Sequence, residues 1–213
     1  MPLDKHINFF ELEKASARPG CPLCTIVSDR CERYLDNMLF EHISDRAFRK
    51  AHRAAGGFCA FHSRNLESFR DGLAVAILGR DILEDRVESF TKRKILKTKE
   101  RCPVCVEQDR IEQEYLGFLI KAEPAADDVA RQLQDIVVKS SGLCAPHYGQ
   151  LLETAKKIPR WILEFHEKKF ASLLERTNRF IECSAYGREK DFAELNPADQ
   201  VVWKELAANL RGS

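Results

Sequence analysis

Four short pairs of cysteine and histidine residues carry the most recognisable chemistry in the sequence. Two pairs are cysteines three residues apart, and two are a cysteine followed three residues later by a histidine; in chain order they are Cys21/Cys24, Cys59/His62, Cys102/Cys105 and Cys144/His147. Three thiolates and one imidazole form a standard tetrahedral ligand set for structural zinc. In chain order, the first pair with the second and the third with the fourth give two such sets. We therefore predict two zinc ions per chain, each bound by three cysteines and one histidine.

The spacing within each pair indicates that the pair stands at the start of a helix. Residues i and i+3 face the same side of a helix, so both side chains of a pair can bind one ion. Pro22 suits the first helical position, where its missing N–H costs nothing. The positive end of the helix dipole also favours the net charge of −1 that three thiolates and Zn²⁺ carry together. Each ion would thus hold the starts of two helices together.

Other uses of these cysteines give two alternative interpretations. An iron–sulfur cluster is the first, because three cysteines and a histidine can also hold one; the protein would then be a redox or electron-transfer protein, or an enzyme subunit. Metal sensing or delivery, in which a site fills and empties, is the second. A thiol redox motif is disfavoured, because CxxC in such proteins usually follows a strand, and the sequence shows no alternating strand pattern.

The ligand sets favour a non-enzymatic role. A catalytic zinc normally has three protein ligands and keeps one position for water or substrate, whereas each set here offers four ligands. No phosphate-binding glycine loop and no GxSxG nucleophile motif occurs in the sequence. We expect closed tetrahedral shells, and we assign no catalytic residue and no organic cofactor.

The sequence contains an internal repeat. A shift along the chain aligns CPLC with CPVC and Tyr34-Leu35 with Tyr115-Leu116, and after a short insertion it aligns GFCAFH with GLCAPH. The same motifs in the same order predict two tandem, pseudo-symmetric units, each stapled by one metal site. The predicted division is a first metal-binding repeat over 1–100, a second over 101–183, and a linker and helix over 184–213.

Each repeat is expected to be helical, so the predicted fold class is all-α. Apolar residues recur at helical spacing after each CPxC motif. A long helix is predicted over 73–97, with Leu83, Val87 and Phe90 on one face. Asn196-Pro197 is expected to cap and begin a final helix. Cys31 lies on an apolar stripe and is expected to be a core thiol rather than a ligand.

Composition limits the class of partner and the cellular location. The 213 residues contain 34 Lys and Arg against 33 Asp and Glu, so no excess charge draws the chain to nucleic acid or to an anionic membrane. No apolar run is long enough to span a bilayer, and the N-terminus lacks the pattern of a secretory signal. We expect a cytoplasmic protein whose eight cysteines are mostly ligands or free thiols rather than disulfides.

Several segments together resemble a known family. These segments are FELEKA, GCPLC, RYLDNML, GGFCAFH and AILGRDIL. In combination they are similar to an uncharacterised bacterial and archaeal family, a domain of unknown function with paired CPxC and GxCxxH motifs. The resemblance implies a prokaryotic cytoplasmic setting and no established activity. The resulting hypothesis is a structural zinc protein that presents a helical surface to an unidentified protein partner, with a homo-oligomer left open.

Overall fold

The computed structural model describes residues 5–69, 71–98, 100–123 and 128–212, and every regular element in these ranges is a helix. The predicted all-α class is confirmed. No helix among these residues combines the length and the apolar character needed to cross a membrane. The predicted pseudo-symmetry of two tandem repeats stays a prediction.

The chain divides into two compact units. Unit 1 consists of Met1–Ile26 together with Glu114–Ser213, and unit 2 is Val27–Gln113. The boundaries fall inside two long helices, α2 (Pro22–Glu41) and α6 (Pro103–Ile120), so each of these helices contributes its two ends to different units. These units are not the segments 1–100, 101–183 and 184–213. That division follows the sequence motifs and stays a prediction.

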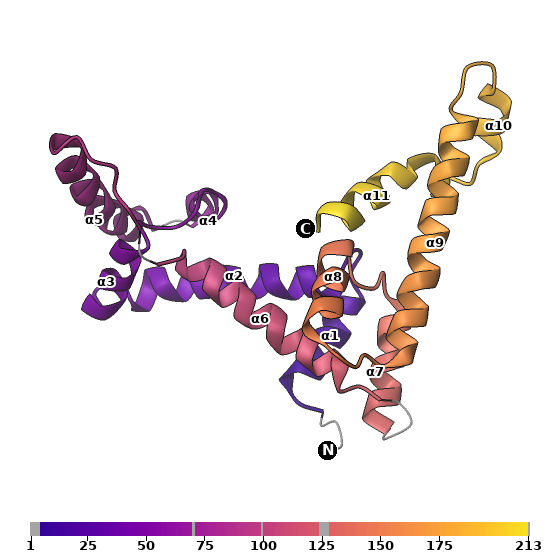
Figure 1. Ribbon diagram of the computed structural model, residues 1–213, viewed down its shortest axis with the longest axis horizontal. Helices are drawn as coiled ribbons and strands as arrows, with labels where there is room; N and C mark the ends of the chain where they lie inside the picture. Colours follow the sequence, from indigo (N-terminus) through magenta and orange to yellow (C-terminus); the bar gives the residue numbers. More distant parts are fainter. Residues whose placement is uncertain (1–4, 70, 99, 124–127, 213) are drawn as a thin grey trace. The chain divides into compact units, whose positions relative to one another are not determined.

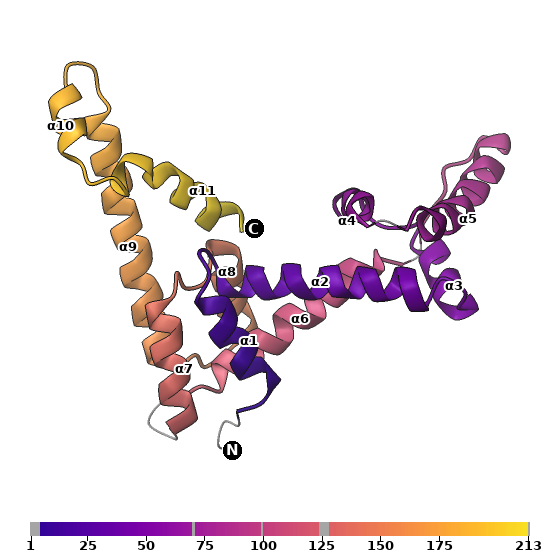
Figure 2. The ribbon, with the colours of Figure 1, turned by 180° about the vertical axis from the view of Figure 1, so that it is seen from behind.

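Unit 1 is built around a long helix, α9 (Arg160–Cys183). Its other elements are α1 (Ile7–Ser16), α7 (Asp128–Lys139), α8 (Ala145–Thr154), α10 (Glu189–Glu194), the 3₁₀ turn η2 (Asp199–Val201) and α11 (Val202–Arg211). Helix α1 packs on α7, and α11 packs on both α8 and α9. From the α10 end of α9, the chain returns along α11 toward α8 (Figures 1 and 2).

The start of the last helix differs slightly from the prediction. Asn196 does act as a cap, because its side-chain oxygen accepts a hydrogen bond of 2.9 Å from the backbone N–H of Asp199. The turn that it caps is the 3₁₀ turn η2, and the α-helix itself begins only at Val202, which is fully buried.

Unit 2 contains α3 (Arg46–Ala54), α4 (Ala60–Asn65), the 3₁₀ turn η1 (Leu66–Ser68) and α5 (Gly72–Thr91). Its core cluster is Leu39, Ala74 and Leu78, with partly buried apolar residues packed around them. Arg49 on α3 binds Asp81 on α5 through two hydrogen bonds of 2.7 and 2.6 Å. This bidentate ion pair fixes how α3 and α5 pack on each other.

The long helix of unit 2 is shorter than predicted. It ends at Thr91 rather than at Lys97, and Arg93 has a positive φ of 51°, which is incompatible with a continuing helix. Leu83, Val87 and Phe90 on this helix are 59%, 55% and 64% exposed. They therefore add little to the core of the unit.

Candidate metal centres

All four ligand pairs lie at helix N-termini, as the spacing predicts. Cys21 precedes Pro22 at the start of α2, and Cys102 precedes Pro103 at the start of α6. Cys59 and Cys144 occupy the N-cap positions of α4 and α8, with nearly identical extended conformations (φ −67°, ψ 166° and φ −70°, ψ 166°). The second residue of each pair lies in the first turn of its helix, so both side chains of a pair face one point beyond the helix end.

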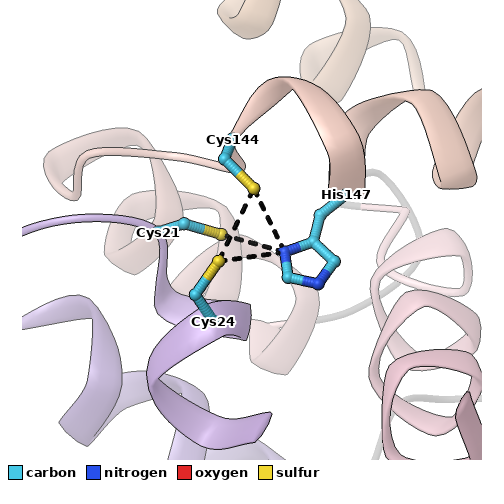
Figure 3. A group of neighbouring side chains, drawn as sticks. All are labelled: Cys21, Cys24, Cys144 and His147. Carbon is cyan, nitrogen blue, oxygen red and sulfur yellow. Dashed lines mark hydrogen bonds between the residues drawn. The ribbon is translucent and has the colours of Figure 1, made fainter. Parts of the chain in front are cut away.

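Site 1 is a group of four buried side chains in unit 1: Cys21, Cys24, Cys144 and His147 (Figure 3). The His147 Nδ1 atom lies 3.4, 3.3 and 3.2 Å from the sulfurs of Cys21, Cys24 and Cys144. The sulfurs of Cys24 and Cys144 are 3.6 Å apart. The four side chains converge from the starts of α2 and α8.

Site 2 repeats this arrangement in unit 2 with Cys59, His62, Cys102 and Cys105. The His62 Nδ1 atom lies 3.3, 3.6 and 3.4 Å from the sulfurs of Cys59, Cys102 and Cys105. The sulfurs of Cys59 and Cys105 are 3.7 Å apart. Here the side chains converge from the starts of α4 and α6. Cys59 and Cys105 are partly exposed, whereas Cys102 and His62 are buried.

The predicted assignment of pairs to sites is wrong. The structure joins Cys21/Cys24 with Cys144/His147 instead of Cys59/His62, and it joins Cys102/Cys105 with Cys59/His62. The reason lies in the helix lengths. The 20 residues of α2 lead the chain about 30 Å away from its own start, and the nine residues of α3 span only about 14 Å. A helix that short cannot return Cys59 to the start of α2.

The distances between ligand atoms fit a single tetrahedral ion. With zinc bonds to sulfur and nitrogen of ordinary length, a tetrahedron has S···S edges of about 3.8 Å and S···N edges of about 3.6 Å. The sulfur–sulfur distances of 3.6 and 3.7 Å lie close to this value. They are far longer than the roughly 2.0 Å of a disulfide bond, and all eight cysteines are free thiols.

Crowding makes these thiols hard to ionise without a cation. The neighbouring thiols of Cys144 and Cys24, followed by burial, raise the pKa of Cys21 well above its ordinary value. Burial and then the adjacent Cys59 raise the pKa of Cys105 to about 12. Several thiolates packed together repel one another, and a divalent cation at their centre would remove that cost.

At Cys59, the helix N-terminus lowers the pKa of the thiol, in contrast to the raised pKa of Cys21 and Cys105. Burial raises the pKa of this thiol, but the backbone N–H groups of His62 and Phe61 and the adjacent thiols outweigh burial, so that the net effect is a lowered pKa. The first turn of α4 thus favours the thiolate that a metal needs.

A second layer of contacts surrounds site 1. The His166 Nε2 atom accepts a 2.9 Å hydrogen bond from the backbone N–H of Leu143, and Lys169 donates a 2.5 Å hydrogen bond to the carbonyl oxygen of Leu143. The other ring nitrogen of His166 donates to the Ile162 carbonyl at 2.8 Å, which fixes the neutral tautomer. Both backbone polar groups of Leu143, the residue next to Cys144, are thus held by α9.

Two residues of this layer, Lys169 and Gly212, were not predicted from the sequence. Lys169 is partly buried; burial lowers its pKa, whereas the cysteines of site 1 raise it, so the ammonium lies within electrostatic reach of the thiolates. Gly212 is buried against the site, and a Cβ atom there would lie 3.7 Å from the sulfurs of both Cys24 and Cys144. The chain that follows α11 therefore covers the sulfurs.

The remaining cysteines and histidines lie outside both groups. Cys31 is 5% exposed, so its prediction as a core thiol is confirmed, and Cys183 is also buried. His166 is buried, and both of its ring nitrogens are hydrogen bonded. His52 is buried between Phe48 and Phe58, and neither of its ring nitrogens has a hydrogen-bond partner.

Comparison with known proteins gives no functional description. The chain is 26% identical over 176 residues to an uncharacterized 23.9 kDa protein in the xynA 3'region of Caldicellulosiruptor sp. (strain Rt8B.4), a match that covers 78% of this chain and 83% of the relative. No family model and no solved structure matches the chain. A similar protein that is itself uncharacterised is consistent with the resemblance to an uncharacterised family.

Proposed function

We propose that the protein binds one zinc ion in each of the two Cys₃His groups, and that both ions have a structural role. One observation carries this proposal: two separate groups each bring three sulfurs and one imidazole nitrogen within 4.8 Å of one another. The donor types are those of structural zinc sites, and the spacing suits one ion at the centre of each group.

The same spacing favours a single ion over an iron–sulfur cluster. A cluster contains two or more iron atoms, and ligands bound to different irons must be separated by the width of the cluster. In site 2 the sulfurs of Cys59 and Cys105 lie only 3.7 Å apart, and both lie close to the same His62 nitrogen. This arrangement suits ligands of one ion. Thiolate and imidazole ligands in a tetrahedron then favour zinc over magnesium, calcium or manganese.

The ligand count supports a structural rather than a catalytic role. Each group supplies four donors, so a bound tetrahedral zinc would have no position left for water or substrate. The ion would instead fasten two helix starts that lie far apart in the sequence. Site 1 would join α2 to α8, and site 2 would join α4 to α6.

We further propose that the protein works by presenting a helical surface to a protein partner in the cytoplasm. Leu83, Val87 and Phe90 on α5 support this role, because all three are more than half exposed and follow one another at helical spacing. The free thiols support an intracellular, reducing environment.

Elemental analysis of protein purified without oxygen tests the zinc proposal. We expect two zinc atoms per chain and a colourless protein. Replacement of zinc by Co²⁺ should give the intense visible absorption of a tetrahedral thiolate complex. A brown protein containing iron and inorganic sulfide, or a metal content of one atom or fewer per chain, would contradict the proposal.

A further inference from the structure

The two candidate metal centres have the same ligands but different surroundings. In site 1 all four ligands are buried, with exposed fractions of 7% or less. In site 2 two of the four ligand residues, Cys59 and Cys105, are partly exposed. A competing ligand has to reach the metal or a departing thiolate, so partial exposure of two of the four ligand residues leaves site 2 more open to attack from solution than site 1.

The second layer increases this difference. At site 1, His166 and Lys169 on α9 bind the N–H and the carbonyl oxygen of Leu143, the residue that directly precedes Cys144. Gly212 covers the sulfurs from the other side. Departure of Cys144 from a metal would therefore require contacts with α9 to break as well. Such second-layer partners orient metal ligands and strengthen metal binding.

At site 2, among the described residues, the backbone that precedes Cys59 has fewer hydrogen bonds from side chains of neighbouring elements than the backbone that precedes Cys144. Phe58, which leads into Cys59, accepts a 3.2 Å hydrogen bond from Ser63, a residue of the same short helix as Cys59. Within the described part of unit 2, no side chain of α5 forms a hydrogen bond with the Phe58 peptide. The loop that carries Cys59 is otherwise held by the Gly57 N–H, which donates a 3.0 Å hydrogen bond to the His52 carbonyl on α3, and by packing of Phe58 on the core cluster of the unit. Among the described residues, it lacks the two hydrogen bonds to side chains of a neighbouring long helix that Leu143 has at site 1.

The sequence explains why α5 cannot repeat the role of α9. When Cys59 is aligned with Cys144, the positions of His166 and Lys169 fall on Asp81 and Glu84. Asp81 binds Arg49, and Glu84 lies 3.7 Å from Arg53 and from Arg80. Both acids are engaged with arginines. In addition, the lysine that could neutralise a site of net charge −1 is replaced by an acid.

From these differences, and resting on the proposed zinc function, we propose that site 2 is an exchangeable zinc site and that site 1 is kinetically locked. Exchange is a ligand substitution without redox change. A donor atom of a competing ligand, such as a thiolate or an aminocarboxylate, supplies its electron pair to zinc, and the Zn–S bond of Cys59 or Cys105 breaks. The released thiolate takes a proton from solvent, further donor atoms of the competitor displace the other two thiolates and the His62 nitrogen in the same way, and zinc leaves bound to the competitor. Site 2 would thus fasten α4 to α6 while it is filled and also let the protein donate or sense zinc, whereas site 1 would stay filled and keep unit 1 folded.

The test is the rate of zinc transfer from the full-length, zinc-loaded protein to an excess of the chromophoric chelator 4-(2-pyridylazo)resorcinol. We expect two phases of one zinc equivalent each, with rates that differ by at least about tenfold, the lower limit for loss of second-layer support. Cys59→Ser should remove the fast phase and leave the slow one. Cys144→Ser should remove the slow phase and leave the fast one.

Lys169→Met tests the cause without removing a ligand. It should speed the slow phase by about 10- to 100-fold and leave the fast phase unchanged. Lys168→Met is the matched control, because Lys168 is an exposed neighbour on the same helix, and it should change neither phase. If a cysteine variant fails to fold, the comparison of Lys169→Met with Lys168→Met still tests whether the contacts from α9 slow zinc release from site 1.

The outcomes separate this inference from the proposed function. Two zinc atoms per chain with a single release rate would overturn the inference and leave the two structural sites intact. Two phases with the fast phase retained in Cys59→Ser, or with no effect of Lys169→Met on either phase, would also overturn it. Fewer than two zinc atoms per chain before the chelator is added would overturn the proposed function itself.

Discussion

Replacement of His166 by leucine tests whether the contacts behind site 1 support the metal. The substitution keeps an apolar side chain of similar size on α9 but removes the acceptor for the Leu143 N–H. Leu143 is 2% exposed, so water cannot easily take over this hydrogen bond. The Ile162 carbonyl, which also loses the His166 side chain, lies within α9 and keeps its place in the helix.

The expected destabilisation follows from the one buried group that loses its partner. An unsatisfied buried donor costs about 2 kcal/mol. For a chain of this size, that loss corresponds to a decrease in melting temperature of about 4 to 8 °C. Loss of a second-layer partner should also weaken zinc binding at site 1 by about 10- to 100-fold. Site 2 lies in the other unit and should keep its affinity.

Thermal unfolding followed by circular dichroism measures the first effect, and equilibrium competition with a chelator measures the second. His166→Gln should recover part of both losses, because its amide oxygen can accept a hydrogen bond. His42→Leu is the control, since His42 is exposed and belongs to neither metal group. Unchanged melting and unchanged zinc affinity in His166→Leu would refute the argument. Equal weakening of both sites would refute it as well.

Three further predictions follow from particular residues. Burial lowers the pKa of His166 from 6.5 to about 4. Between these pH values the unfolded chain binds the proton and the folded chain does not, so the free energy of unfolding falls as pH falls. In parallel urea titrations, the wild type should therefore lose more stability over this range than His166→Gln does. Equal losses would contradict this assignment. Cys59→Ser should lower the zinc content to one atom per chain and reduce the melting temperature, whereas Cys31→Ser should keep both zinc atoms; full zinc content in Cys59→Ser would exclude Cys59 as a ligand. Gly142→Ala should destabilise the protein more than Gly187→Ala, because both glycines have positive φ but only a Cβ at Gly142 would meet another side chain, Phe165 at 2.7 Å; equal melting temperatures would show that this contact relaxes freely.

The helical class and the candidate ligands could be predicted from the sequence because both depend on local spacing. Apolar residues at helical intervals define the helices, and a pair of ligands at i and i+3 can face one ion wherever a helix begins. The core position of Cys31 follows from the same periodicity. Local spacing was less reliable at helix ends, where α5 stops at Thr91 instead of Lys97.

Only the tertiary structure decided which ligands share a site. Either CxxC pair combined with either CxxH pair gives the same set of three cysteines and one histidine, so the motifs alone cannot choose between the two arrangements. The choice depends on which helix starts meet, and that depends on helix lengths and turns: α3 is too short to return the chain along α2. The support of site 1 by His166 and Lys169 was equally hidden, because these side chains act through the backbone of Leu143 and leave no motif in the sequence.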